Sequence, residues 1–228
     1  MLVISGIATF LALWFVAPYA IRMLDVHRLR KLCRRQRAIV LTFDDGPSSS
    51  VTSKLLILLA EYQASATFFA LGRKIESDPR VCALILAEGH EFGSHSYRHL
   101  NAWKNSPLAV YRDIDMGLHF ANNTSSSVWF RPPYGKITLA TLLQVRINKC
   151  LLAWWTIDST DTWRTPRPVE AVLRAIRRQG GGVILLHDHD RFDNLEREAY
   201  VLDMTRAILE VARNEGFRVC KLSDIYGL

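Results

Sequence analysis

The sequence predicts an α/β protein, a mostly parallel sheet with helices packed against it, preceded by one N-terminal transmembrane helix. The chain has 228 residues, of which 49% are hydrophobic and 22% charged, and this suits one folded domain with a short appendage. An uncharged apolar run opens the chain, and from residue 38 onward strand-like runs alternate with amphipathic stretches. These observations predict a membrane helix over residues 1–24, a basic juxtamembrane segment over 25–37 and a globular domain over 38–228.

The apolar run carries no charged residue before Arg22. About 20 apolar residues cross the hydrocarbon core of a bilayer. A cleaved signal peptide fits less well, because such peptides carry a basic residue before the apolar core, whereas here the basic residues all follow it. A buried core helix is the other alternative, but seven basic residues directly after it would be unusual. Trp14 and Tyr19 suit the membrane interface, so we expect a retained membrane helix.

The positive charge of the protein gathers directly after this run. Seven of the 29 Lys and Arg residues and one of the 22 Asp and Glu residues lie between Arg22 and Arg37, which leaves 22 basic and 21 acidic residues elsewhere. A basic cluster beside an apolar run is typical of a membrane flank, and no nucleic-acid-binding motif accompanies it, so we expect no nucleic-acid partner. The positive-inside rule predicts a single-pass protein with its domain on the cytoplasmic face. The periplasmic or extracellular face stays open, because large domains can cross despite their flanking charge.

From residue 38 the strand and helix patterns alternate about seven times, which predicts a parallel sheet. Either a closed or slightly irregular barrel or an open doubly wound sheet would satisfy this alternation. No GxGxxG motif follows the first strand, so a dinucleotide-binding sheet is disfavoured. Pro107 and Pro168 suit helix starts, and Gly180 suits a helix end. The expected strands are 39–43, 66–71, 90–94, 128–131, 151–157, 183–186 and 217–222, and the expected helices are 51–63, 79–88, 107–121, 137–146, 167–179 and 197–215.

Polar residues follow the ends of these strands. In a barrel, the carboxyl ends of the strands meet on one rim, which is where active sites are built. The sequence therefore predicts an active site from five sets of residues, which begin at Asp44, His95, Arg131, Asp158 and His187.

The first two sets suggest a metal site. Asp44 and Asp45 leave an apolar strand in different directions, so one can bind a metal while its neighbour handles a proton; a plain Asp-Gly turn is the alternative. His95 and His99 are four residues apart, and on one face of a helical turn both imidazoles could reach one cation. Together with Asp45 they would form a face of two histidines and one carboxylate that leaves positions for water and substrate, as metal-assisted hydrolysis requires.

The remaining sets offer a base-holding arginine, an oxyanion donor and an acid. Arg131 can hold a carboxylate, and the stiff Pro-Pro-Tyr-Gly turn after it can aim a backbone N–H into the site. His187 ends an apolar strand and can act as a general acid if a carboxylate, for which Asp161 is the candidate, orients its ring. The cluster of Asp188, His189 and Asp190 is interpreted as turn residues or a solvated cluster.

The motifs TFDDGP, HSYRH, RPPYG and LLH, in this order between residues 38 and 225, resemble those of the NodB-type polysaccharide deacetylases, carbohydrate esterase family 4. Each motif is moderately specific, and the ordered set is highly so. The resemblance implies a distorted (β/α) barrel of about seven strands for residues 38–228. It also implies a metal-dependent hydrolase of non-peptide carbon–nitrogen bonds, which removes an N-acyl group, normally acetyl, from an amino sugar in a polysaccharide, oligosaccharide or lipid-linked glycan.

Carried over residue by residue, the resemblance assigns the base and the metal ligands. Asp44 matches the catalytic base, and Asp45, His95 and His99 match the ligands of a divalent metal ion, usually zinc. In this scheme Asp44 takes a proton from the attacking water.

The resemblance assigns the other roles as well. Arg131 matches the arginine that steadies the base, and the Tyr134 backbone N–H matches the oxyanion donor. Leu185 matches the wall of the acetyl pocket, and His187 matches the general acid. The resemblance thus implies that Tyr134 serves both in catalysis and in substrate binding.

One motif departs from the family pattern. The family usually has Asp followed directly by Trp, whereas Thr162 lies between Asp161 and Trp163 here. We expect Asp161 to orient the general acid and Trp163 to contribute to substrate binding, and the inserted Thr162 bears on which acyl groups fit.

Two other functions stay open. The first is a related amidohydrolase that acts on a C–N bond outside sugars, such as a cyclic imide. The second is a catalytically silent, membrane-bound glycan-binding protein, which is disfavoured because the base and all three ligand positions are filled. Because the basic segment would hold the domain at the anionic cytoplasmic leaflet, the sequence favours a lipid-linked N-acylated sugar as substrate.

Overall fold

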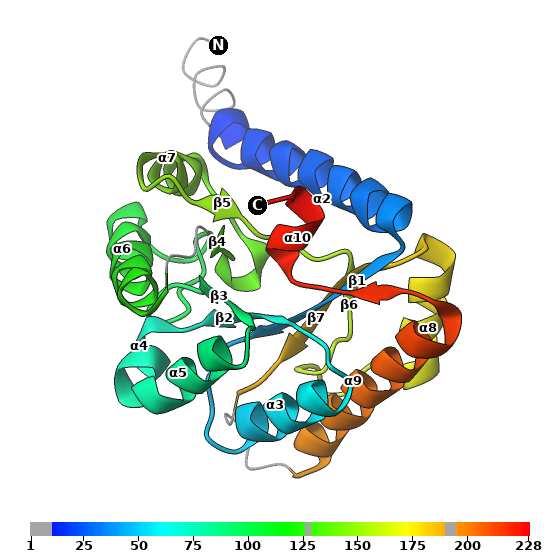
Figure 1. Ribbon diagram of the computed structural model, residues 1–228. Coiled ribbons are helices and arrows are strands. Elements are labelled where there is room, and N and C mark those ends of the chain that lie inside the picture. The colour runs from blue at the N-terminus through cyan, green and yellow to red at the C-terminus, as the bar shows by residue number, and fades with distance from the viewer. Residues whose placement is uncertain (1–10, 126–128, 190–194) are drawn as a thin grey trace.

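The computed structural model describes residues 11–125, 129–189 and 195–228. Within these ranges eight parallel strands form one sheet in the order β5-β4-β3-β2-β1-β7-β6, and β8 pairs with β1. The sheet curls into a partial barrel with helices around it (Figure 1). It lacks the reversal of strand order that marks a doubly wound sheet, so the predicted distorted barrel is confirmed. The strands are β1 Ala38–Asp44, β2 Thr67–Ala70, β3 Glu91–Ser94, β4 Trp129–Phe130, β5 Leu151–Leu152, β6 Ile157–Asp158, β7 Gly182–His187 and β8 Arg218–Val219.

The predicted helices are present at all six positions, with ends shifted by a few residues. The two short helices α4 and α10 were not predicted, because one or two turns are too short to show a helical period. The helical elements are the π-helical η1 Ala12–Val16, α2 Ala17–Gln36, α3 Val51–Glu61, α4 Gly72–Ser77, α5 Pro79–Ala87, α6 Pro107–Thr124, the 3₁₀ turn η2 Pro133–Gly135, α7 Leu139–Ile147, α8 Val169–Gln179, α9 Leu195–Glu215 and α10 Leu222–Tyr226.

The single strand predicted over residues 151–157 is wrong, because this segment divides into β5 and β6. The Ala153 N–H donates to the Phe130 carbonyl at 2.9 Å, and the Thr156 N–H donates to the Val183 carbonyl at 2.9 Å. Phe130 and Val183 belong to β4 and β7, near opposite ends of the strand order. The segment therefore crosses from one edge of the curled sheet to the other, and a crossing chain cannot remain one straight strand.

Strand β1 lies at the centre of the fold, and all seven of its residues are buried. Ile39, Leu41 and Phe43 join the larger apolar cluster, with side chains from α3, α8 and α9, whereas Ala38 and Val40 join a second cluster with side chains from α2. This alternation follows the two-residue period of a strand. Each fully buried Leu, Ile or Phe side chain stabilises the fold by about 1.5–3 kcal/mol, so β1 is anchored on both faces.

Helix α2 runs through the boundary predicted at residues 24 and 25, so the basic segment is helical and packs on the barrel. Val26, Leu29 and Cys33 are buried at helical spacing, and α2 contacts α7, α10, β1 and β7. Figure 1 shows α2 beside α10, on the side of the barrel away from α3 and α9.

In the part of the chain that the structure describes, no helix has the length and apolar character needed to span a membrane. The first ten residues of the membrane helix predicted over 1–24 lie outside the described residues. The membrane helix therefore stays a prediction.

Candidate active site

Strands β1 and β7 bring two of the predicted catalytic residues together. Asp44 ends β1, His187 ends β7, and the two residues are direct partners in the parallel register. The next residue, Asp45, has a φ of 74°, and its N–H donates to the Phe69 carbonyl of β2 at 3.2 Å. This left-handed turn sends the Asp45 side chain in a different direction from that of Asp44.

Buried Asp45 and His95 and half-buried His99 form a group that could hold a metal ion. One ligand atom from each residue lies within 4.8 Å of the others. The His99 Nε2 lies 3.4 Å and the His95 Nε2 lies 3.7 Å from the Asp45 Oδ1. Ligands bound tetrahedrally to zinc at about 2.1 Å lie roughly 3.4 Å from one another. Two imidazoles and one carboxylate at these separations therefore fit a divalent ion and leave a position open on it.

The carbonyl of Arg131 orients one of these imidazoles. The His95 Nδ1 lies 2.7 Å from the Arg131 carbonyl oxygen, to which an Nδ1–H donates. That tautomer leaves the Nε2 lone pair pointing at the metal position, which is how a second hydrogen bond commonly fixes a metal-binding histidine.

The predicted helical turn for His95 and His99 is wrong, because residues 95–100 form an irregular loop. Ser96 and His99 have φ values of 66° and 70°, and this doubled-back backbone brings the two rings to a centroid distance of 4.9 Å. Gly117 of α6 makes room for the loop, since a Cβ at Gly117 would lie 2.3 Å from the Ser96 backbone.

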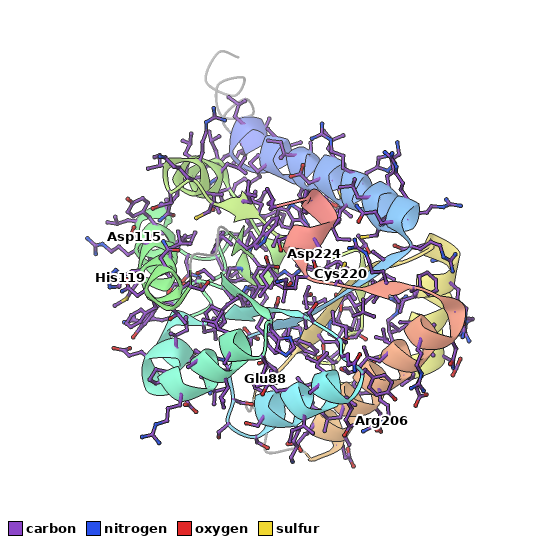
Figure 2. All side chains as sticks on the ribbon, viewed as in Figure 1. Glu88, Asp115, His119, Arg206, Cys220 and Asp224 are labelled. Atoms are coloured by element: carbon purple, nitrogen blue, oxygen red, sulfur yellow. The ribbon has the colours of Figure 1, made fainter. Side chains whose placement is uncertain are left out.

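Asp113 of α6 holds this loop and was missed by the sequence reasoning. Its carboxylate is buried and accepts hydrogen bonds from the Arg98 N–H at 2.8 Å and from the Leu100 N–H at 3.3 Å. By contrast, Asp115 is exposed and lies on the outer side of α6 (Figure 2). The sequence signal for Asp113 was an acidic residue on the apolar face of an amphipathic helix.

Arg131 lies under the site with no exposed surface. Its Nη1 donates to the Asp44 Oδ1 at 2.8 Å and to the Thr42 hydroxyl at 2.7 Å, and its Nη2 donates to the Trp154 carbonyl at 3.3 Å. The guanidinium also lies 4.0 Å from the centre of the Phe69 ring. Burial lowers the Arg131 pKa and the Asp44 carboxylate opposes this shift. The charged pair fixes Asp44 and leaves its second oxygen toward the site.

Tyr134 lies in the short turn that follows Arg131. Its φ of 57° places it in the left-handed region, inside the 3₁₀ turn η2. Its ring lies 4.4 Å from the ring of His99 and remains 54% exposed, so the side chain covers one edge of the metal position while facing solvent.

His187 and Asp161 form a hydrogen-bonded pair at the other side of the site. The His187 Nδ1–H donates to the Asp161 Oδ1 at 2.8 Å, and the His187 backbone N–H donates to the Asp161 Oδ2 at 2.7 Å. The Ser159 hydroxyl also donates to Asp161. Burial works to lower the His187 pKa, but the carboxylates of Asp161, Asp44 and Asp45 outweigh burial and raise the pKa to about 9. The ring therefore holds its proton at neutral pH.

The two residues expected to bind the acyl group differ in burial. Leu185 on β7 is 5% exposed, and its carbonyl accepts from the Ser159 N–H at 3.3 Å. Trp163 is 63% exposed, and its N–H donates to the Thr160 carbonyl at 2.9 Å in a local turn. The structure thus gathers Asp44, Asp45, His95, His99, Arg131, Tyr134, Asp161, Leu185 and His187 at one end of the barrel, but leaves the Trp163 ring largely in solvent.

The interpretation of Asp188 as part of a solvated cluster is wrong. Asp188 is 1% exposed, and the Thr52 hydroxyl donates to its Oδ2 at 2.6 Å. Burial raises the Asp188 pKa to about 7. A Cβ at Gly46 would lie 2.2 Å from this carboxyl group, so the Gly of the Asp-Asp-Gly turn is needed for its approach. His189 is half-buried, and Asp190 lies outside the described residues.

Comparisons with known proteins agree with this arrangement. The family model described as "Polysaccharide deacetylase" matches residues 31–149. A peptidoglycan-N-acetylglucosamine deacetylase from Bacillus cereus is 30% identical over 194 residues, which cover 83% of this chain and 88% of that protein. A chitooligosaccharide deacetylase from Bradyrhizobium sp. is 32% identical over 158 residues, which cover 67% of this chain and 71% of the relative.

A solved structure is similar as well. The peptidoglycan deacetylase PdaC from Bacillus subtilis matches with a TM-score of 0.70 and 28% identity, over 84% of this chain and 91% of that chain. The family match, the relatives and the curled parallel barrel all agree with the ordered motifs. This chain therefore belongs to the polysaccharide deacetylase family, hydrolases that act on the N-acetyl amide bonds of sugars.

Proposed function

We propose that this protein is a metal-dependent deacetylase that removes the N-acetyl group from an amino sugar in a glycan related to peptidoglycan or chitooligosaccharides. The observation that carries the proposal is the group of Asp45, His95 and His99 beside the buried Asp44–Arg131 pair. The relatives from Bacillus cereus and Bradyrhizobium sp. act on such glycans by name, which supports the choice of substrate.

Asp44 has the geometry of a general base. Its Oδ1 is bound by Arg131, and its Oδ2 lies 3.7 Å from the His95 Nε2, beside the metal position. A water molecule held there would give its proton to this oxygen as it attacks the amide carbon. A bound divalent ion, zinc by resemblance, would acidify this water and polarise the acetyl carbonyl.

His187 would act on the departing amine, and Tyr134 would act on the carbonyl oxygen. The protonated His187 ring, held by Asp161, can give its Nε2 proton to the departing sugar amine. The Tyr134 backbone N–H would stabilise the negative charge on the carbonyl oxygen. Leu185 would form part of the wall around the acetyl methyl group.

Release of acetate tests the proposal directly. N-acetylated chitooligosaccharides and peptidoglycan fragments would be incubated with the wild-type protein, with a chelator-treated sample, and with that sample after zinc is restored. We expect acetate from the first and third samples. Acetate from none of them, or undiminished release after chelation, would contradict the proposal.

We also propose that the substrate is a lipid-linked amino sugar at the cytoplasmic face of a membrane. Exposed Leu13, Val16 and Leu24 and the basic residues of α2 support this, since each basic residue contributes about 1 kcal/mol of attraction near an anionic leaflet. Protease added to intact spheroplasts tests the orientation. Protection of the domain until the membrane is broken would support it, and digestion in intact spheroplasts would place the domain outside.

A further inference from the structure

We propose that Arg22 is a positioning residue, which fixes the turn that carries the Tyr134 N–H. Through this turn Arg22 couples the N-terminal helix, formed by η1 and α2, to catalysis. The proposal rests on the proposed function, in which this N–H is the oxyanion donor. The proposal gives a positioning role in catalysis to α2, which precedes TFDDGP, the first motif of the domain.

The contact between Arg22 and the turn is direct. The Arg22 Nη1 donates to the Gly135 carbonyl at 3.0 Å, across 113 residues of sequence. The Arg22 guanidinium lies 5.2 Å from the centre of the Trp154 ring and 5.1 Å from that of Trp155. A guanidinium held by two indole rings has little freedom, so its hydrogen bond fixes the direction of the peptide group that it holds.

Gly135 shows how closely the helix and the turn approach each other. Its φ is 60°, and a Cβ there would lie 2.7 Å from the Trp155 ring and 2.9 Å from the Arg22 Nη2. Any larger residue would push the turn off Arg22. The peptide group that Arg22 holds joins Gly135 to Lys136, and its Lys136 N–H donates to the Pro133 carbonyl at 3.0 Å. This carbonyl shares its peptide group with the Tyr134 N–H, so a shift of the Gly135 carbonyl also turns the Tyr134 N–H.

A second contact holds the chain two residues after this turn. The Trp103 Nε1–H donates to the Ile137 carbonyl at 2.8 Å, and the Lys136 ammonium lies 4.1 Å from the centre of the Trp103 ring. Phe15, which precedes Arg22 on the N-terminal helix, meets Trp103 edge-on at a centroid distance of 5.8 Å. The N-terminal helix therefore holds residues 135–137 in two ways. Arg22 contacts Gly135 directly, and Phe15 packs against Trp103, which holds Ile137.

Arg22 differs from the other basic residues of α2 in its surroundings. The side chain of Arg28, six residues later, is 76% exposed and lies 3.9 Å from Asp25. Arg28 is thus a matched control, a cation on the same helix that faces solvent. If the basic residues of α2 served only to attract the protein to an anionic surface, replacing Arg22 and replacing Arg28 would have the same effect.

Small displacements of an oxyanion donor have large kinetic effects. Loss of one donor lowers kcat by about 10²–10³-fold, and a misplacement of about 1 Å can lower the rate by about 10²-fold. We expect Arg22→Ala to lower kcat by roughly 10-fold to 100-fold with little change in KM, since the donor acts mainly in the transition state. Arg22→Lys, which keeps the charge but not the planar fork, should recover part of this loss.

The experiment compares Arg22→Ala, Arg22→Lys and Arg28→Ala in the full chain. Acetate release gives kcat and KM for each, and added guanidinium ion should restore part of kcat in Arg22→Ala alone. Metal content should be unchanged in all three variants. Equal kcat for Arg22→Ala and Arg28→Ala, or a loss that appears in KM alone, would overturn the proposal.

Amide hydrogen exchange at residues 134–137 needs no substrate and separates the two proposals. Faster exchange in Arg22→Ala than in Arg28→Ala supports the positioning role even if the wild-type protein releases no acetate, an outcome that would count against the proposed function alone. Equal exchange in the two variants would overturn the positioning role. If Arg22→Ala does not fold, Arg22→Lys takes its place in the same comparisons with Arg28→Ala, because it keeps the charge but not the planar fork that holds the Gly135 carbonyl.

Discussion

Asp44 and Asp45 illustrate how two neighbouring residues of one type acquire different tasks. Asp44 is the last residue of β1 and accepts a hydrogen bond from buried Arg131 at 2.8 Å. Asp45 is the first residue of a left-handed turn and lies next to His95 and His99. The difference arises from the backbone, because a residue with positive φ leaves the direction of the strand.

This difference predicts distinct outcomes for substitutions at the site. Replacement of Asp45, His95 or His99 by Ala should remove the metal ion and the activity together, because each residue supplies one ligand. Asp44→Asn should keep the metal and lose turnover, because the amide cannot take the proton. Elemental analysis of purified variants beside acetate release measures both properties. Near-normal hydrolysis by metal-loaded Asp44→Asn would show that the assigned roles are wrong.

The pKa of His187 predicts the pH at which activity falls on the alkaline limb of the pH–rate profile. The acid form of its ring is the active form, and its pKa is raised to about 9, so activity should persist at neutral pH and fall as pH rises through about 9. His187→Ala should lower the rate by roughly 10²–10⁴-fold. In Asp161→Asn the carboxylate that raises the pKa is gone, so the limb should move to lower pH, toward the usual imidazole value of about 6.5.

The control for this profile is Asp115→Asn on the outer side of α6, which should leave the limb in place. An unchanged limb in both His187→Ala and Asp161→Asn would assign the acid role to another group. His189, whose ring lies 5.8 Å from that of His187, would be the next candidate.

The loop between β3 and α6 shows that a metal-binding motif does not require a regular element. Residues 95–100 owe their shape to positive φ values at Ser96 and His99 and to the Asp113 carboxylate that accepts two of their N–H groups. Helix α6 therefore acts as the rigid part of the metal site, although it supplies no ligand to it.

Asp113→Ala should weaken this loop, because the Arg98 and Leu100 N–H groups lose the carboxylate that accepts their hydrogen bonds. Loss of a charged hydrogen-bond acceptor at a buried site destabilises a protein by about 1–3 kcal/mol. We expect a fall of this size in the free energy of unfolding in urea, with weaker metal binding. Asp115→Ala on the exposed side of the same helix should change neither property, and equal effects of the two substitutions would contradict the role of Asp113.

In the whole molecule, the N-terminal helix is part of the folded barrel domain. Leu29 of α2 is fully buried in the cluster that also holds Val40 of β1 and Val183 of β7. A helix packed in this way cannot separate from the barrel without exposing this cluster to water.

Leu29→Ala should therefore lower the free energy of unfolding by about 2–5 kcal/mol, the usual range for a buried Leu-to-Ala change. Leu24 lies on the same helix and is 59% exposed, so Leu24→Ala should stay within about 0.5 kcal/mol of wild type. Urea unfolding of both variants measures the difference. An effect of Leu29→Ala no larger than that of Leu24→Ala would show that α2 contributes little to the stability of the domain.

The sequence by itself determined the parallel α/β alternation, because the periods of strands and helices are local properties. It also determined which residues lie at the strand ends, because the polar residues that follow each apolar strand can be read directly along the chain. Asp44 and His187 could be placed on one rim in this way before their register was known.

Only the tertiary structure decided the crossing of residues 151–158 between the sheet edges, the buried positions of Asp113 and Asp188, and the docking of Arg22 on Gly135. Each of these depends on partners far away in the chain. The apolar face of α6 marks Asp113 as facing inward but does not show which N–H groups it binds. The carboxylate of Asp188 and the guanidinium of Arg22 have the same local pattern whether they face water or a distant polar group. Their burial is settled only when the distant group packs against them.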